Sequence, residues 1–346
     1  MNPETHKLYG PEFPICTVRD DVRIHRLVLD SLGIKQVAAC IGGSMGGMLV
    51  LEWAMLGREY VRCIVPLATS ARHSAWCISW GEAQRQCIYS DPKYDDGYYK
   101  LTEPPISGLS AARMSALLTY RSRNSFESRF GRNAPEKKVQ PVVEKKEEDN
   151  VSIHNDGSRN RHHGRPRSNS NESITSNGSS ASNASRNPTK SRPQHYFTAQ
   201  SYLRYQGEKF ISRFDANCYI SITRKLDTHD LSRDRLEFAD LSAAVKSIQQ
   251  PALVIGITSD GLFTYSEQIF IARHIPDSQL HRIESMEGHD AFLLEFQEID
   301  DLIKKFLREK IPDVLEGEVE GWELAEDLGD WTGSSVFGEA EDVTQW

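Results

Sequence analysis

The chain has 346 residues, of which 38% are hydrophobic and 26% are charged, and its formal net charge at pH 7 is −8. This acidity argues against general binding to nucleic acid or to anionic membranes, because both need a basic face, and no apolar run approaches the roughly 20 residues that span a bilayer. The N-terminal segment lacks the apolar stretch of a secretory signal and the six cysteines form no C-x-x-C pair, so we expect a reduced, cytoplasmic protein without a disulfide or zinc scaffold.

The first predicted elements are a helix, a strand, a second helix and a second strand. The helix at 20–32 carries an apolar face formed by Ile24, Leu27, Val28 and Leu32, and Gly33 ends it. We expect a strand at 36–42, a helix from 45 to about 56, and a strand at 63–69. Both strands are short, apolar and bounded by turn or charged residues, which is typical of central strands in a parallel sheet that is covered on both faces.

Residues 71–240 interrupt this alternation. Their patterns are mostly helical and rich in Trp, Tyr and Arg, and we interpret them as a helical cap inserted into the sheet domain. Within the cap, residues 131–195 contain no Phe, Trp or Tyr, and the part from 151 to 192 holds 11 Ser and 7 Asn. Such a segment buries too little apolar surface to offset its ordering entropy, so we predict that it is disordered.

The alternation of strands and helices resumes towards the C-terminus. The expected elements are a strand at 251–257, a helix at 266–274, a strand at 279–284 and a helix from about 291 to 307. Residues 1–70 and 241–310 therefore form the two parts of an α/β core, with the cap between them. Residues 311–346 carry 11 acidic residues and no Lys or Arg, and they are expected to form an acidic tail.

The strongest local motif is the run Gly42-Gly43-Ser44-Met45-Gly46-Gly47, between a predicted strand and a predicted helix. This is G-x-S-x-G in the context of a nucleophile elbow, the sharp turn that presents the reactive serine of an α/β-hydrolase fold. Phosphate-binding loops and simple packing turns are also rich in glycine. The run lacks the Lys-Ser/Thr of a P-loop and the G-x-G-x-x-G spacing of a dinucleotide site. The sequence therefore favours Ser44 as a nucleophile.

An elbow serine needs a base and an acid, which in this fold follow in the order Ser, Asp, His. Asp260 comes after the strand at 251–257, and His289 comes after the strand at 279–284. Taken alone, Asp260-Gly261 could be a simple turn and His289 a helix cap. Because the carboxyl ends of parallel strands share one edge of the sheet, we predict a catalytic triad of Ser44, Asp260 and His289.

Several longer segments carry a family resemblance. They are GGSMGGM at the elbow, ATSARHSAWCISW at 68–80, SYLRYQGEKF at 201–210, RFDANCYI at 213–220, LDTHD at 226–230 and EGHDAFLLE at 287–295. Together they resemble the homoserine O-acetyltransferases, in particular the fungal form. The resemblance covers nearly the whole chain apart from the Ser/Asn-rich segment.

The resemblance implies acetyl transfer from acetyl-CoA to the hydroxyl of L-homoserine, a step towards methionine, through an acetyl-Ser44 enzyme. No cofactor or metal is implied beyond acetyl-CoA as co-substrate, and relatives are usually homodimers. The backbone N–H of Met45 matches one oxyanion donor, Arg213 the residue that binds the substrate carboxylate, and Asp290 the residue that pairs with the substrate ammonium. Tyr219 is a candidate for the wall of the same pocket.

Three alternatives stay open for these residues. Arg213 could form a salt bridge with Asp215, Asp290 could be a charge at a helix N-terminus, and Tyr219 could pack in the cap. The acceptor could be serine or a deacetylcephalosporin-like alcohol rather than homoserine. Finally, the segment that resembles the family starts near Met1 without the first strands of the fold or the loop that gives the second oxyanion donor. This departure predicts a shortened α/β-hydrolase core. Besides homoserine O-acetylation and acetylation of a different alcohol, it leaves a third hypothesis, an inactive chain that acts as a binding or oligomerisation module.

Overall fold

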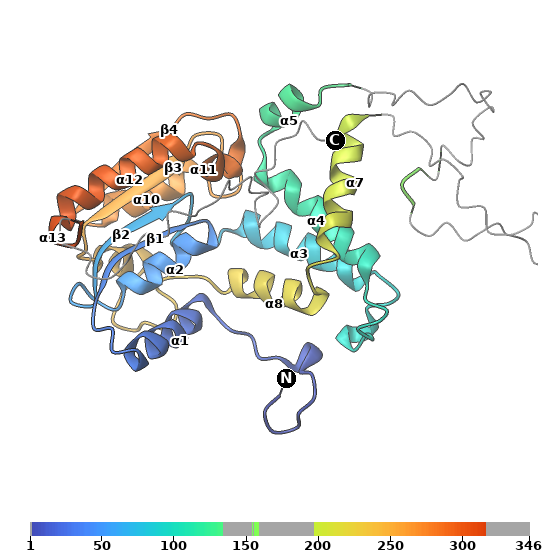
Figure 1. Cartoon of the computed structure of the whole chain (residues 1–346), viewed down its shortest axis with the longest axis horizontal. Coiled ribbons are helices and arrows are strands. Elements are labelled where there is room, and N and C mark those ends of the chain that lie inside the picture. Colours follow the sequence, from blue (N-terminus) through green and yellow to red (C-terminus); the bar gives the residue numbers. More distant parts are fainter. Residues whose placement is uncertain (1, 134–153, 155, 159–196, 316–346) are drawn as a thin grey trace, which may run out of the picture.

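The computed structural model describes residues 2–133, 154, 156–158 and 197–315. Its centre is a parallel four-stranded sheet (Figure 1). The strands are β1 (Val37–Gly43), β2 (Val61–Leu67), β3 (Ala252–Ile257) and β4 (Ser278–Ile283), and they lie side by side in this order. All four strands lie within two residues of the positions predicted from the sequence, so the α/β class is confirmed.

The sheet is buried on both faces because its apolar side chains alternate between two clusters. Ile64 and Val254 belong to a cluster on one face, together with α2 (Met45–Ala54), α9 (Leu241–Lys246) and α10 (Tyr265–His274). Val65 and Ile255 belong to a cluster on the other face, which includes side chains of α12 (Phe296–Lys310). This period-2 alternation, in strands that are apolar throughout, is what a sheet covered on both sides requires.

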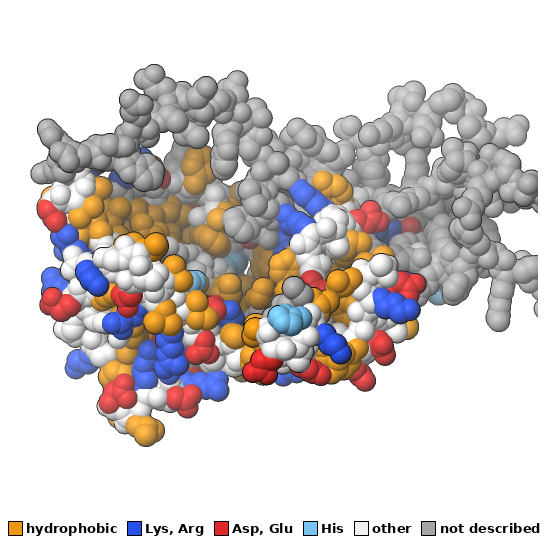
Figure 2. Space-filling view, turned by 60° about the horizontal axis from the view of Figure 1, so that its bottom comes forward, with side chains coloured by type: hydrophobic (Ala, Val, Ile, Leu, Met, Phe, Trp, Pro, Cys, Tyr) orange, Lys and Arg blue, Asp and Glu red, His pale blue; other side chains and the backbone are white. Residues whose placement is uncertain are grey.

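The first helix, α1 (Val18–Ser31), begins with a capping box between Thr17 and Asp20 and buries Val18 and Val22 against the fold. Four apolar side chains along this helix and at its C-terminal end are more than half exposed: Ile24, Leu27, Val28 and Leu32. The predicted helix is therefore confirmed, whereas its predicted apolar face lies at the surface of the described structure. Figure 2 brings this side of the molecule forward and shows hydrophobic side chains at the surface among charged ones.

Between β2 and α9 the described part of the chain leaves the sheet and forms the helices that we call the cap helices. They are α3 (Ala75–Tyr89), α4 (Ile106–Tyr120), α5 (Arg123–Arg129), α7 (Thr198–Phe210) and α8 (Ala216–Asp227). In Figure 1 they lie to one side of the sheet, with α3 and α8 next to it. Ile88, Leu109, Phe210 and Tyr219 form a core that α3, α4, α7 and α8 share. The domain boundaries at 70 and 240 stay a prediction.

The single helix predicted at 291–307 is wrong in one respect. The chain forms α11 (Ala291–Leu294) and then α12, because the backbone at Glu295 leaves the helical region with φ −87° and ψ 40°. A last short helix, α13 (Pro312–Leu315), is tied to β2 by an ion pair between Arg62 and Asp313 at 2.6 Å. Most of the predicted Ser/Asn-rich segment and acidic tail lies outside the described residues.

Candidate active site

Ser44 lies in the sharp turn between β1 and α2, with φ 59° and ψ −125°. A positive φ is strained for a residue with a side chain, and such strain clusters at functional sites. The backbone N–H of Ser44 donates to the carbonyl of Leu67 over 3.0 Å, and the Oγ1 of Thr69 donates to the carbonyl of Ser44 over 2.7 Å. Two bonds from the neighbouring strand and its loop therefore hold the strained turn in place.

Gly42 makes this turn sterically possible. A Cβ atom at Gly42 would lie 2.5 Å from the carbonyl oxygen of Gly46, in the first turn of α2. Real Cβ atoms do not approach backbone this closely, so only glycine lets the helix start directly over the end of β1. The two outer glycines of the G-x-S-x-G motif thus meet each other across the serine.

The structure brings the three predicted triad residues together. The Nε2 of His289 lies 2.9 Å from the Oγ of Ser44, and its Nδ1 lies 2.7 Å from the Oδ2 of Asp260. Both His289 and Asp260 are at least 96% buried. This is the nucleophile–base–acid arrangement in which the base can accept the serine proton while the carboxylate fixes its ring.

The carboxylate of Asp260 is held from its other side. Its Oδ1 accepts the backbone N–H groups of Leu262 and Phe263, at 2.8 and 2.9 Å. The ring of Phe263 then packs against the imidazole of His289, with ring centroids 5.3 Å apart. The turn after β3 therefore holds the carboxylate of Asp260 and also places the ring of Phe263 against His289.

The loop that carries His289 is anchored to the cap. Arg121, at the end of α4, binds the carboxylate of Glu287, and its Nε lies 2.8 Å from the Oδ2 of Asp290. Gly288 has φ +73°, and a Cβ there would lie 2.4 Å from the backbone nitrogen of Ser122. The base therefore sits in a loop that is clamped on both sides and fits only with glycine before it.

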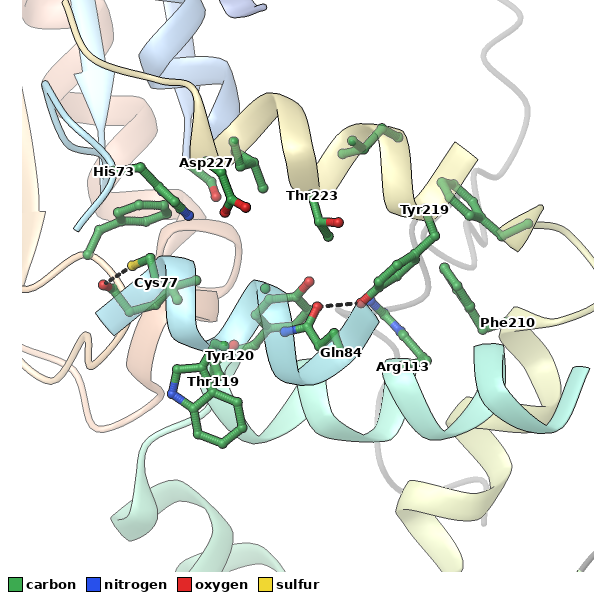
Figure 3. A pocket seen from close by; sticks show the side chains of 18 of the residues that line it. His73, Cys77, Gln84, Arg113, Thr119, Tyr120, Phe210, Tyr219, Thr223 and Asp227 are labelled. Atoms are coloured by element: carbon green, nitrogen blue, oxygen red, sulfur yellow. Dashed lines mark hydrogen bonds between the residues drawn. The ribbon is translucent and has the colours of Figure 1, made fainter. Parts of the chain in front are cut away.

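A cavity of about 430 Å³ opens beside Ser44 (Figure 3). Its walls come from the cap helices α3, α4, α7 and α8, from the segment between α7 and α8, and from the loops after β2 and β3. The polar side chains along it are those of His73, Gln84, Arg113, Thr119, Tyr120, Arg213, Tyr219, Thr223 and Asp227. An apolar cavity with a few polar groups, next to a nucleophile and a base, has the form of a small-molecule site.

The three predicted substrate residues are placed differently. Arg213 lines the cavity as an exposed residue, and Tyr219 lines it as a buried one. The hydroxyl of Tyr219 donates to the Oε1 of Gln84 over 2.6 Å, and burial raises its pKa. Asp290 is buried against Arg121 and is not among the cavity residues. The roles given to these residues stay predictions.

Arg113 and His73 are among the cavity residues that sequence reasoning missed. Arg113 is 96% buried, and its guanidinium lies over the rings of Phe210 and Tyr120 at 5.0 and 5.5 Å. The signal was an arginine within an otherwise apolar stretch of α4. His73 is also buried, and burial together with nearby positive charge lowers its pKa to about 4, so it is neutral at pH 7.

Two kinds of feature are absent from the described part of the chain. No three His, Cys, Asp or Glu side chains gather there in a way that could hold a metal ion. None of its helices has the length and apolarity that a membrane span requires.

The chain is similar to known proteins over most of its length. Residues 2–296 match the family model described as alpha/beta hydrolase fold. The chain is 56% identical to the homoserine O-acetyltransferase of Emericella nidulans and 57% identical to that of Saccharomyces cerevisiae, over 374 and 380 aligned residues. Each alignment covers 100% of this chain and 76% of the relative.

Solved structures agree in fold. The crystal structure of homoserine O-acetyltransferase from Bacillus anthracis matches with a TM-score of 0.68 and 19% identity, covering 90% of this chain and 70% of that one. An acetylester hydrolase from Corynebacterium glutamicum matches with a TM-score of 0.63 and 20% identity, covering 88% and 71%. At such identities the likeness concerns the fold alone.

Proposed function

The chain belongs to the homoserine O-acetyltransferases of the alpha/beta hydrolase fold, and we propose that it transfers the acetyl group of acetyl-CoA to the hydroxyl of L-homoserine. The observation that carries this proposal is the pair of contacts of His289, at 2.9 Å to the Oγ of Ser44 and 2.7 Å to the Oδ2 of Asp260. Such a triad performs acyl transfer, and the family relationship supports homoserine as the acceptor.

In the proposed first half-reaction, His289 takes the proton of Ser44 as its Oγ attacks the thioester carbonyl. The oxyanion that forms accepts a hydrogen bond from the backbone N–H of Met45, the first residue of α2, whose N–H points out of the helix start. The C–S bond then breaks, His289 gives its proton to the departing thiolate, and the acetyl group stays on Ser44.

In the second half-reaction the acceptor alcohol replaces the thiol. His289 takes the proton of the acceptor hydroxyl, whose oxygen attacks the acetyl carbonyl. The bond to Ser44 breaks and the serine recovers its proton from His289. The same three residues therefore serve both halves, as a ping-pong reaction requires.

Two guanidinium groups line the cavity and can bind the acceptor carboxylate. Arg213 holds this role by family resemblance, whereas Arg113 is buried beside Tyr120, whose ring lies 6.3 Å from that of His289. A planar guanidinium binds a carboxylate with two parallel hydrogen bonds. Asp290 remains the proposed partner of the ammonium by resemblance, and Tyr219 a proposed part of the pocket wall.

The other parts of the proposal rest on the sequence. The triad chemistry uses side chains and acetyl-CoA as co-substrate without a further cofactor. A homodimer is proposed by family resemblance, and a cytoplasmic location from the overall composition of the sequence.

The test is intact-protein mass spectrometry after brief exposure to acetyl-CoA, with Ser44→Ala as the control. We expect one acetyl adduct that requires Ser44 and disappears when homoserine is added. An adduct that decays equally fast without an acceptor would instead indicate a hydrolase, and soluble, folded protein without any adduct would contradict the proposal. Competition between homoserine and serine for the adduct, followed as O-acetyl product, identifies the preferred acceptor.

A further inference from the structure

A second polar region of the cavity lies at the end of α8, away from Arg213. Asp227 is the last residue of this helix and lines the cavity. Its Oδ2 lies 2.7 Å from the Nη2 of Arg85, a residue of α3 whose side chain is 98% buried. Arg85 also pairs with Glu82, whose side chain is 47% exposed. Asp227 is thus the inner of the two carboxylates bound to this buried cation.

The ion pair between Asp227 and Arg85 leaves one hydrogen-bond acceptor and one donor unsatisfied. Within the described structure, the Oδ1 of Asp227 and the Nη1 of Arg85 are buried and have no hydrogen-bond partner. Both atoms lie 3.3 Å from the position that a Cβ atom would take at Gly81, which also lines the cavity. A methyl group at this position would already be a tight fit, so glycine at position 81 leaves a small space beside both atoms. Leaving two such groups unpaired is costly unless a ligand or water satisfies them.

The charges of the pair indicate what kind of group fits. An ammonium bound to Asp227 would approach the guanidinium of Arg85, and a carboxylate bound to Arg85 would approach Asp227, so either ion meets a like charge. His73, on the same cavity wall, has a buried Nδ1 without a partner in the described structure and is neutral at pH 7. Figure 3 shows His73 and Asp227 at the same end of the cavity. An uncharged group that both accepts and donates hydrogen bonds suits this surface best.

The position of the pair also separates it from the amino-acid end of the cavity. The 12 residues of α8 span about 18 Å, with Arg213 before the start of the helix and Asp227 at its end. The carboxylate and ammonium of an amino acid are attached to one carbon atom. A single acceptor molecule therefore cannot reach both ends with these two groups, and the end at Asp227 is open to the other substrate.

We propose that Asp227, Arg85 and the space at Gly81 form a subsite for the acyl-carrying arm of the thioester donor. This inference rests on the proposed function, in which the donor is acetyl-CoA. The pantetheine arm of such a donor is uncharged near its sulfur and carries secondary amides and a hydroxyl. Arg85 donates to a carbonyl or hydroxyl oxygen of the arm, and Asp227 accepts from an N–H or O–H.

The experiment compares three variants of the full chain. Gly81→Ala fills the space and removes no charge, and alanine is favourable inside a helix. Asp227→Ala removes the acceptor, while Glu82→Gln is the matched control because it changes the outer partner of Arg85 and leaves the cavity intact. For each variant, calorimetry gives the Kd of free pantetheine, and stopped-flow kinetics gives the rate of Ser44 acetylation by acetyl-CoA and by 4-nitrophenyl acetate, which has no arm.

We expect Gly81→Ala and Asp227→Ala to weaken pantetheine binding and to slow acetylation by acetyl-CoA by about 10-fold or more, the effect of losing hydrogen bonds to charged groups. Acetylation by 4-nitrophenyl acetate and all properties of Glu82→Gln should change less than twofold. The subsite is refuted if the wild-type chain does not bind pantetheine, if Gly81→Ala binds it normally, or if the loss is equal for both acetyl donors. A wild-type chain that binds pantetheine but is not acetylated by acetyl-CoA contradicts the proposed function and leaves the subsite supported.

Discussion

The Nε of Arg121 lies 2.8 Å from the Oδ2 of Asp290, the residue that follows His289 in the chain. The same arginine binds Glu287, two residues before His289. A residue at the end of a cap helix therefore holds the loop of the base from both sides. Because Arg121 does not line the cavity, it acts through the position of His289 and not through the substrate.

Replacing Arg121 with Ala is expected to lower kcat by about 10–100-fold, because small displacements of a catalytic group are costly, while KM for the acceptor changes little. The buried carboxylate of Asp290 and the partly buried one of Glu287 both lose this ion pair, so the free energy of unfolding should fall by about 3–5 kcal/mol. Steady-state kinetics and urea unfolding test this. Arg129→Ala is the control, since Arg129 contacts Glu287 at 3.1 Å from a more exposed position. Equal losses in both variants would argue against the clamp.

Asp260→Asn is expected to lower kcat by about 10⁴-fold with little loss of stability. The Oδ1 of the new asparagine still accepts the backbone N–H groups of Leu262 and Phe263, so the loop stays in place. Its amide nitrogen, however, faces the Nδ1 of His289 and favours the wrong tautomer of the base. Kinetics of acetyl transfer, together with thermal unfolding, provide the measurement. A fall in kcat below tenfold would mean that another residue orients His289.

Gly288→Ala should cost more than about 2 kcal/mol of unfolding free energy and most of the activity. Alanine is strained at φ +73°, and its Cβ would overlap the backbone nitrogen of Ser122, which lies 2.4 Å away. Gly261→Ala, next to Asp260, is the matched control because no atom lies within 4 Å of its Cβ position. We expect that variant to stay within about 0.5 kcal/mol of the wild type in chemical denaturation.

The stability of the fold should depend on pH through His73. Burial lowers the pKa of this residue from 6.5 to about 4, so between these values the unfolded chain binds more protons than the folded one. Above pH 6.5 the neutral His73 therefore costs the folded state nothing. As the pH falls from 6.5 towards 4, the free energy of unfolding decreases by about 3 kcal/mol in total. Urea unfolding between pH 7 and 4.5 should show a shallower decline for His73→Gln. Parallel curves would show that His73 is not buried in its neutral form.

The triad could be predicted from the sequence because each of its members follows a strand. Ser44, Asp260 and His289 come after β1, β3 and β4, and the edge of a parallel sheet brings such positions together. The same local reasoning located the four strands within two residues of their observed ends. It failed at Glu295, where one predicted helix divides in two, because periodicity does not reveal a single residue that leaves the helical region.

The sequence by itself determined the α/β class, the elbow at Ser44 and, through its family resemblance, the acyltransfer chemistry. Only the tertiary structure decided what surrounds that chemistry. Arg121 meets Asp290, and Asp227 meets Arg85, across segments that are far apart in the chain. A motif records the local backbone that a turn requires, whereas the pairing of buried charges depends on how separate helices pack. The wall of the cavity is therefore a property of the folded cap, and no single segment encodes it.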